Sequence, residues 1–154
     1  MKKKIYIAYI VLSLIGFAVS LYLTVEHFLK SQGACDFNAT VSCSLVNTSI
    51  YSEILGIPVA IFGLLWFVAL FLLAWQAYTK KDKKQQKRLL YWNIGGLLFV
   101  VYLIIAEILL KAICPLCTAV HVIVLVALGL SIYSYKNNMN NNNIQYYTKG
   151  HKFS

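Results

Sequence analysis

The sequence predicts an all-α integral membrane protein: a four-helix bundle with one outer loop that carries a cysteine pair and a short amphipathic helix. Two observations lead to this fold class. Of the 154 residues, 60% are hydrophobic and only 12% are charged, a balance too apolar for an ordinary soluble domain. The chain also contains four apolar stretches close to the roughly 20 residues that a helix needs to cross a bilayer. Because a helix satisfies its own backbone hydrogen bonds in lipid, these stretches predict a bundle of spanning helices.

The predicted spans cover residues 5–28, 57–78, 89–110 and 112–135. The first span follows a basic start, but its apolar run is longer than the core of a signal peptide and no clear cleavage site follows it. We therefore expect this segment to be retained as a helix. Residues 1–136 then form one transmembrane domain. Residues 137–154 are rich in asparagine, and we expect them to be a disordered cytoplasmic tail because such a composition cannot build a core.

Basic residues predict the orientation of the bundle. The net charge is +9, and the 14 Lys and Arg residues fall mainly in three groups: three at the N-terminus, six in residues 79–88 and three in the tail. Four spans place all three groups on one side, and the positive-inside rule makes that side the cytoplasm. The basic character thus reflects topology and attraction to anionic lipid. We expect no nucleic-acid partner, because the chain has no soluble domain to carry a basic surface.

All four cysteines fall on the opposite, extracytoplasmic side. Cys35 and Cys43 lie in the loop between the first two spans, and Cys114 and Cys117 lie where the third span turns into the fourth. Disulfides form and persist in an oxidising compartment of this kind. Four cysteines allow three pairings, and spacing alone leaves all three open.

The Cys-Pro-Leu-Cys segment at residues 114–117 has the properties of a redox site. Pro115 suits the first position of a helix, which makes Cys114 the expected N-cap residue. Free amides and the positive end of the helix dipole favour thiolates there. Residues three apart on a helix are neighbours, so Cys114 and Cys117 can form a strained disulfide that is easily reduced. The segment therefore predicts thiol exchange rather than a permanent cross-link.

Two other classes of protein remain open at this point. A zinc site built from four thiols would use two C-x2-C pairs, whereas seven residues separate Cys35 from Cys43, so we predict no metal. A structural protein with four spans would hold stable disulfides that resist mild reductant.

Three stretches resemble a known family. Residues 35–44 read Cys-Asp-Phe-Asn-Ala-Thr-Val-Ser-Cys-Ser, with Ser49 six positions after Cys43, and they resemble the paired-cysteine loop of the vitamin K epoxide reductase family. Residues 55–63, Leu-Gly-Ile-Pro-Val-Ala-Ile-Phe-Gly, are similar to the version of the following turn in microbial members. Residues 114–118, Cys-Pro-Leu-Cys-Thr, complete a resemblance that covers about residues 8–135.

The resemblance implies a quinone-dependent dithiol oxidoreductase that drives disulfide bond formation. By the family's pattern, Cys35 would meet a separate thioredoxin-like protein and Cys43 would form a transient disulfide with Cys114. Cys117 would then deliver the electrons to a quinone such as menaquinone or ubiquinone. Reduction of vitamin K epoxide, as in vertebrate members, is the alternative. His121 stands where animal members usually carry tyrosine, and the loop from Cys43 to Gly56 is short, and both features count against that alternative.

Four residues are expected to contact the quinone: Ser49, Ser52, Leu55 and His121. Residues 49–55 mix apolar and polar side chains as a short amphipathic helix lying on the membrane would, and they could cap the mouth of the bundle. Ser49 could equally serve as a helix cap. His121 follows Cys117 by one helical turn on the same face, and polar groups in a membrane are costly unless they are used.

A last pair of charged residues has the spacing of a structural contact. Glu107 and Lys111 are four residues apart with the acid first, which is a favourable arrangement on a helix. We therefore expect this pair to stabilise the third span rather than to take part in chemistry.

Overall fold

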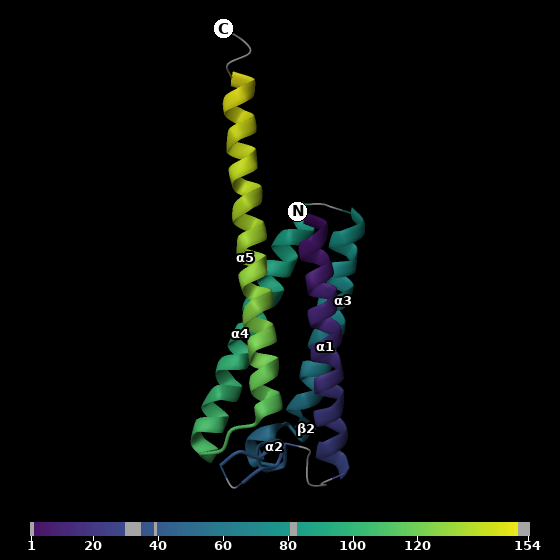
Figure 1. Cartoon of the computed structure of the whole chain (residues 1–154), viewed down its shortest axis with the longest axis vertical. Coiled ribbons are helices and arrows are strands. Elements are labelled where there is room, and N and C mark those ends of the chain that lie inside the picture. Colours follow the sequence, from purple (N-terminus) through teal and green to yellow (C-terminus); the bar gives the residue numbers. More distant parts are fainter. Residues whose placement is uncertain (1, 30–34, 39, 81–82, 151–154) are drawn as a thin grey trace.

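Four long helices make up most of the protein. The computed structural model describes residues 2–29, 35–38, 40–80 and 83–150. The long helices are α1 (Lys2–Leu29), α3 (Val59–Lys80), α4 (Lys83–Leu110) and α5 (Pro115–Gly150) (Figure 1). Each contains a segment long and apolar enough to cross a membrane, at Lys3–Leu29, Val59–Lys80, Lys84–Leu110 and Pro115–Asn137. The prediction of an all-α bundle with four spans is confirmed, and the protein is a multi-pass membrane protein.

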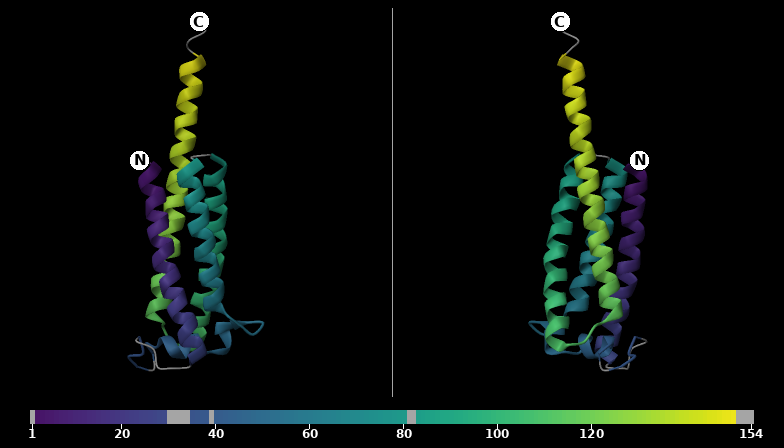
Figure 2. Two further views of the ribbon diagram at one scale, coloured as in Figure 1. Left: turned by 90° about the vertical axis from the view of Figure 1, so that its right-hand side faces the viewer. Right: turned by 60° about the vertical axis from the view of Figure 1, so that its left-hand side comes forward.

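The helices form a closed ring of neighbours. The helix α1 packs against α3 and α5, and α4 packs against the same two helices from the other side (Figure 2). The helices α1 and α3 pack tightly, and the ring of Phe67 occupies the place that a side chain at Gly16 would need. Large apolar side chains such as Leu14, Leu72 and Leu98 lie on the outside of the bundle, as expected for a surface that faces lipid.

A polar cluster ties three helices together inside the bundle. The hydroxyl of Tyr9 donates to the backbone oxygen of Ala127 at 2.9 Å and lies 2.6 Å from the hydroxyl of Ser131. The side-chain amide of Asn93 donates to the same Ser131 oxygen at 3.0 Å. Buried hydrogen bonds of this kind are a common means of holding helices together where lipid offers no partners.

Two helix ends differ from the predicted ends by six residues or more. The helix α4 begins at Lys83, six residues before the predicted start, because the Lys, Gln and Arg residues of this basic segment are good helix formers. The helix α5 continues past residue 135 to Gly150 and extends away from the bundle (Figure 1). We expected a disordered tail from residue 137, and the structure describes the backbone of residues 137–150 as helix, while residues 151–154 lie outside the described residues. The division of the chain into a domain and a tail stays a prediction.

The cysteine loop, residues 35–58, crosses one end of the bundle. It contains the short helix α2 (Cys43–Asn47), the 3-10 turn η1 (Ile50–Ser52) and a small hairpin of β1 (Glu53–Ile54) and β2 (Ile57–Pro58). The hairpin is antiparallel, with Glu53 opposite Pro58 and Ile54 opposite Ile57.

The predicted amphipathic helix over residues 49–55 is therefore wrong in detail. Leu55 and Gly56 form the two-residue turn of the hairpin with φ values of 55° and 78°, which suit such a turn and cannot continue a helix. The short helix of the loop lies earlier instead, at Cys43–Asn47, where the Ser42 side chain accepts a hydrogen bond from the amide of Leu45 and caps it.

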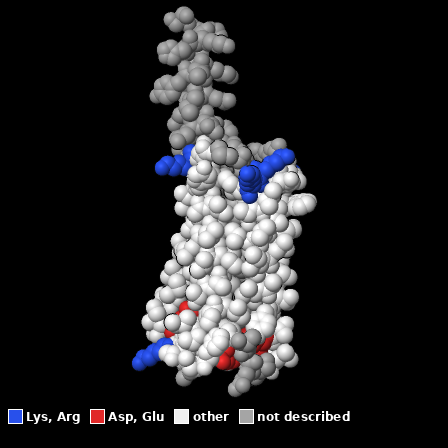
Figure 3. Space-filling view, viewed as in Figure 1, with Lys and Arg blue, Asp and Glu red and all other residues white. Residues whose placement is uncertain are grey.

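Charge is divided between the two ends of the bundle. Figure 3 shows Lys and Arg gathered at the end where the N-terminus lies, and Asp and Glu gathered at the end with the cysteine loop, beside one basic side chain. The middle of the surface between them carries neither kind of charge in this view. An uncharged belt between two charged ends is the pattern of a protein that crosses a bilayer.

Candidate active site

All four cysteines meet at the loop end of the bundle. Cys35 and Cys43 form a disulfide with their Cα atoms 5.5 Å apart, and Cys114 and Cys117 are free thiols. The sulfur of Cys114 lies 3.3 Å from that of Cys43. Cys43 and Cys114 are both fully buried. The sulfur of Cys43 is thus bonded to one cysteine and in contact with a second.

The start of α5 positions the inner pair. Pro115 is the first residue of the helix, and the amide of Cys117 donates to the sulfur of Cys114 at 3.1 Å. This is the N-cap arrangement that the sequence predicts for Cys114. The backbone oxygen of Cys114 accepts hydrogen bonds from the amide of Thr118 at 2.9 Å and from its hydroxyl at 3.0 Å.

A short backbone bridge brings the loop cysteine to the inner pair. Val41 pairs with Ile113 in parallel orientation. In this bridge, the amide of Ser42 donates to the backbone oxygen of Ile113 at 3.1 Å, and the amide of Ile113 donates to the backbone oxygen of Thr40 at 2.8 Å. Because Ser42 directly precedes Cys43 and Ile113 directly precedes Cys114, the bridge fixes the two sulfurs side by side.

A cavity inside the bundle opens next to the inner pair. Its walls include Cys117 and His121 of α5, and Ser49 and Ser52 of the cysteine loop. Cys114 is not among the lining residues. His121 is 5% exposed, and its Nε2 atom is buried without a hydrogen-bond partner among the described residues. Three of the four residues expected to contact a quinone therefore share one cavity with one of the cysteines.

The fourth expected residue, Leu55, lies elsewhere. It is 97% exposed at the tip of the hairpin and does not line the cavity. The turn at Leu55 and Gly56 directs the chain away from the bundle before it enters α3, and a contact between Leu55 and a quinone stays a prediction that this cavity does not support. Figure 2 shows the hairpin projecting sideways at this end.

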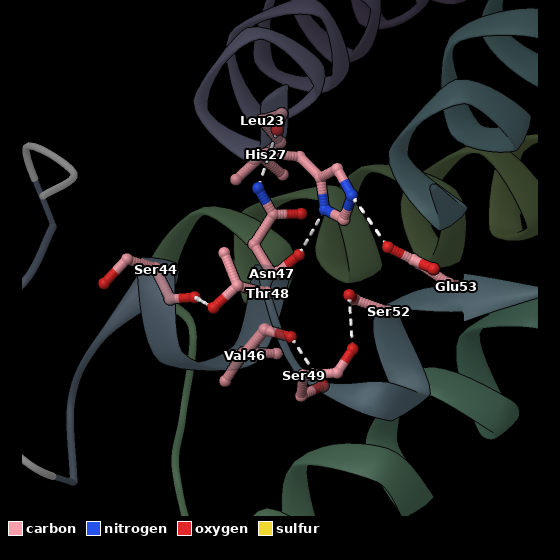
Figure 4. Close-up of polar contacts among 9 residues, drawn as sticks. All are labelled: Leu23, His27, Ser44, Val46, Asn47, Thr48, Ser49, Ser52 and Glu53. Carbon is pink, nitrogen blue, oxygen red and sulfur yellow. Dashed lines mark hydrogen bonds and ion pairs between the residues drawn. The ribbon is translucent and has the colours of Figure 1, made fainter. Parts of the chain in front are cut away.

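The two serines hold the loop in shape as well as lining the cavity. The hydroxyl of Ser49 donates to the backbone oxygen of Val46 at 2.8 Å, and the hydroxyl of Ser52 donates to the backbone oxygen of Ser49 at 2.6 Å (Figure 4). Ser49 precedes the 3-10 turn η1 but does not cap it with its side chain, and its contact with a quinone stays a prediction.

Glu107 belongs to the site, although its spacing from Lys111 predicts a structural pair. It lines the cavity, and its Oε1 atom accepts a hydrogen bond from the amide of Cys114 at 3.2 Å. The predicted pair with Lys111 is wrong, because α4 ends at Leu110 and Lys111 adopts a left-handed φ of 52°. The amide of Ala112 then donates to the backbone oxygen of Glu107, a helix end of the Schellman type. The acid lies seven residues before Cys114, and only the geometry of this turn brings them together.

A comparison with known families decides what kind of protein carries this site. The sequence model of the Vitamin K epoxide reductase family matches residues 7–132, which include all four cysteines. The chain belongs to the vitamin K epoxide reductase family. No protein with a curated description matches the chain. Membership in this family indicates a membrane oxidoreductase of the disulfide and quinone kind.

The cavity has the features that a quinone of this family would need. A binding site for such a molecule is largely apolar with a few placed polar groups, and most of the cavity walls are aliphatic and aromatic side chains. The buried Nε2 atom of His121 is a polar atom in need of a partner. The residues present therefore fit a quinone.

The cysteine geometry suits thiol–disulfide exchange in a vitamin K epoxide reductase family member. Exchange requires a thiol sulfur to approach one sulfur of an existing disulfide. Cys114 approaches Cys43 of the Cys35–Cys43 bond in this way. The loop pair is a disulfide in this structure, and Cys114 and Cys117 of the inner pair are free thiols.

Proposed function

We propose that the protein is a membrane thiol:quinone oxidoreductase that drives disulfide bond formation. It takes electrons from a separate thioredoxin-like protein at Cys35 and Cys43, passes them to Cys114 and Cys117, and releases them to a quinone. The observation that carries this proposal is the position of the Cys43 sulfur, which is bonded to Cys35 and lies 3.3 Å from Cys114.

The relay consists of thiol–disulfide exchanges that balance. A dithiol of the partner reduces the Cys35–Cys43 bond and leaves as a disulfide. The Cys43 thiolate attacks the Cys114–Cys117 disulfide, forms a bond to Cys114 and releases Cys117. Cys35 then attacks Cys43, which restores the Cys35–Cys43 bond and releases Cys114. Two electrons and the matching protons have moved to the inner pair, which is the pairing that the structure has.

The inner pair completes the cycle at the cavity. A bound quinone accepts two electrons and two protons and leaves as a quinol, and Cys114 and Cys117 become a disulfide. Cys117 is the cysteine of this pair that lines the cavity, so it is the thiol that would face the quinone. His121 lines the same cavity, and its Nε2 atom has no hydrogen-bond partner in the part of the chain that the structure describes. This atom would hydrogen-bond a quinone oxygen or carry a proton to it.

The charge distribution supports an orientation for this reaction. Basic side chains gather at the end of the bundle opposite the cysteine loop (Figure 3), and the positive-inside rule assigns that end to the cytoplasm. Both termini would then be cytoplasmic, and the cysteines would face an oxidising extracytoplasmic compartment, where a disulfide-forming enzyme has its substrates.

The proposal is tested with the purified full-length protein, a reduced thioredoxin-like protein and a short-chain quinone. We expect quinol formation that matches dithiol oxidation mole for mole, and we expect Cys114→Ala and Cys117→Ala to abolish it, because neither thiol has a substitute. Mass spectrometry of co-purified lipid would identify the natural quinone. Wild-type turnover in either variant would overturn the relay, and turnover with vitamin K epoxide but not with the protein dithiol would favour the vertebrate type of activity.

A further inference from the structure

The short helix α2 takes part in both halves of the site. Its first residue, Cys43, carries the sulfur that lies 3.3 Å from Cys114. Its last two residues, Val46 and Asn47, line the cavity that also holds Cys117. The position of this one helix therefore decides both whether Cys43 reaches Cys114 and whether the cavity is closed at this end.

One set of contacts holds the start of α2. The carboxylate of Asp36 accepts hydrogen bonds from the hydroxyl of Ser42 at 2.6 Å and from the amide of Ser44 at 2.9 Å. Asp36 directly follows Cys35 in the chain. These contacts therefore lie next to the disulfide that opens and closes in the proposed relay.

A second set of contacts holds the end of α2 to α1 (Figure 4). The side-chain amide of Asn47 donates to the backbone oxygen of Leu23 at 2.6 Å. The backbone oxygen of Asn47 lies 2.6 Å from Nδ1 of His27. The other ring nitrogen of His27, Nε2, lies 3.2 Å from a carboxylate oxygen of Glu53 in β1. His27 therefore joins α1, α2 and the hairpin at one point.

Hydrogen-bond acceptors flank the His27 ring on both sides. The two atoms that face His27, a carbonyl oxygen and a carboxylate oxygen, are both acceptors. An imidazole ring with one N–H donates to one of these two oxygens, and the tautomer decides which. The His27 side chain is only 11% exposed, so water competes little for these bonds.

We propose that His27 is a positioning residue that seats α2 on α1, so that Cys43 stays within reach of Cys114 and the cavity stays closed while the Cys35–Cys43 disulfide opens. This inference rests on the proposed relay. It gives a positioning role to His27, which lies outside the cysteine cluster and the cavity walls. His27 acts through Asn47 and touches none of the reacting sulfurs.

A contact on the far side of the loop provides a matched comparison. The hydroxyl of Tyr102 in α4 donates to the backbone oxygen of Tyr51 at 3.1 Å. It holds the same loop, at η1, through a single hydrogen bond that does not involve α2. Tyr102→Phe therefore loosens the loop without releasing the helix that carries Cys43.

Hydrogen exchange of the α2 amides tests the seating directly and does not depend on turnover. We expect His27→Phe to speed exchange in residues 43–47 by several-fold and up to about tenfold, the effect of losing the contact between the ring and the backbone oxygen of Asn47. Tyr102→Phe should leave these amides unchanged. His27→Gln, which keeps one donor, should fall between His27→Phe and the wild type. If His27→Phe folds and its α2 amides exchange as in the wild type, the inference is wrong whatever the relay does.

Two chemical readouts then link the seating to the reaction. In a Cys117→Ser background, His27→Phe should lower the fraction of folded protein that holds a Cys43–Cys114 bond. With a small dithiol and a short-chain ubiquinone, His27→Phe should raise the KM for the quinone more than it lowers kcat. A Cys117→Ser protein that never forms the Cys43–Cys114 bond would reject the relay, whereas an unchanged bond yield and KM in His27→Phe would reject only the role of His27.

Discussion

The sulfur atoms of Cys43 and Cys114 lie 3.3 Å apart although 71 residues separate them in the chain. Cys43 is at the same time bonded to Cys35, so a single buried sulfur connects the loop pair with the pair at the start of α5. An exchange between the two pairs then needs only the transfer of a bond at Cys43. No large movement of the helices is required.

The first prediction concerns the mixed disulfide. We expect Cys117→Ser to accumulate a Cys43–Cys114 bond. Cys114 can attack Cys43 and release Cys35, but the neighbouring thiol that would free Cys114 from the helix side is gone. Peptide mapping by mass spectrometry without reduction would detect the cross-linked peptides. Cys114→Ser is the matched variant, and a Cys43–Cys117 bond in that protein would reverse the roles given to the two inner cysteines.

The second prediction separates the two pairs by the size of the reductant. Cys35→Ala should block oxidation of a protein dithiol, because Cys35 is the cysteine that would meet the partner. Oxidation of dithiothreitol should be retained at least in part, since a small reagent can reach the inner pair without the loop. Quinol formation measured with each reductant would check this. An equal loss with both would contradict separate roles for the loop pair and the inner pair.

The third prediction concerns the polar cluster between α1, α4 and α5. Tyr9→Phe removes a hydroxyl that contacts Ala127 at 2.9 Å and Ser131 at 2.6 Å. We expect a loss of roughly 0.6 kcal/mol in the free energy of unfolding, and at most about 1.7 kcal/mol, as for other hydrogen bonds between helices in membranes. Unfolding in mixed micelles would measure it. Tyr133→Phe is the control because Tyr133 is exposed on α5. An equal loss of stability in that variant would contradict a specific stabilising role of the Tyr9 hydroxyl.

The features that the sequence predicts correctly are those set by residues close together in the chain. The spans follow from apolar runs whose length is set by the bilayer, and the cap at Cys114 follows from Pro115 at the next position. The shared cavity of Cys117 and His121 follows from four-residue spacing on one helix. None of these depends on how distant parts of the chain meet.

The rest of the site depends on contacts that no local pattern encodes. Glu107 reaches the amide of Cys114 only because the chain reverses at Lys111 with a left-handed φ. Leu55 lies in a stretch whose mix of apolar and polar side chains predicts an amphipathic helix. The glycine that follows it, Gly56, allows the stretch to form a hairpin turn instead. The seating of α2 by His27 joins residues 20 positions apart, and spacing alone cannot reveal it.

The last prediction concerns the packing of α1 on α3. A side chain at Gly16 would begin where the ring of Phe67 lies, and Phe67 is 1% exposed, so the ring has little room to move. We expect Gly16→Ala to cost about 1–3 kcal/mol of stability through overpacking, although alanine is the better helix former. Gly95→Ala is the matched control, because nothing lies within 4 Å of the position that its Cβ would take. That variant should be as stable as the wild type or slightly more stable. Thermal unfolding in detergent, followed by tryptophan fluorescence, would compare the two, and a Gly16→Ala protein as stable as Gly95→Ala would show that α1 and α3 do not pack as closely as described.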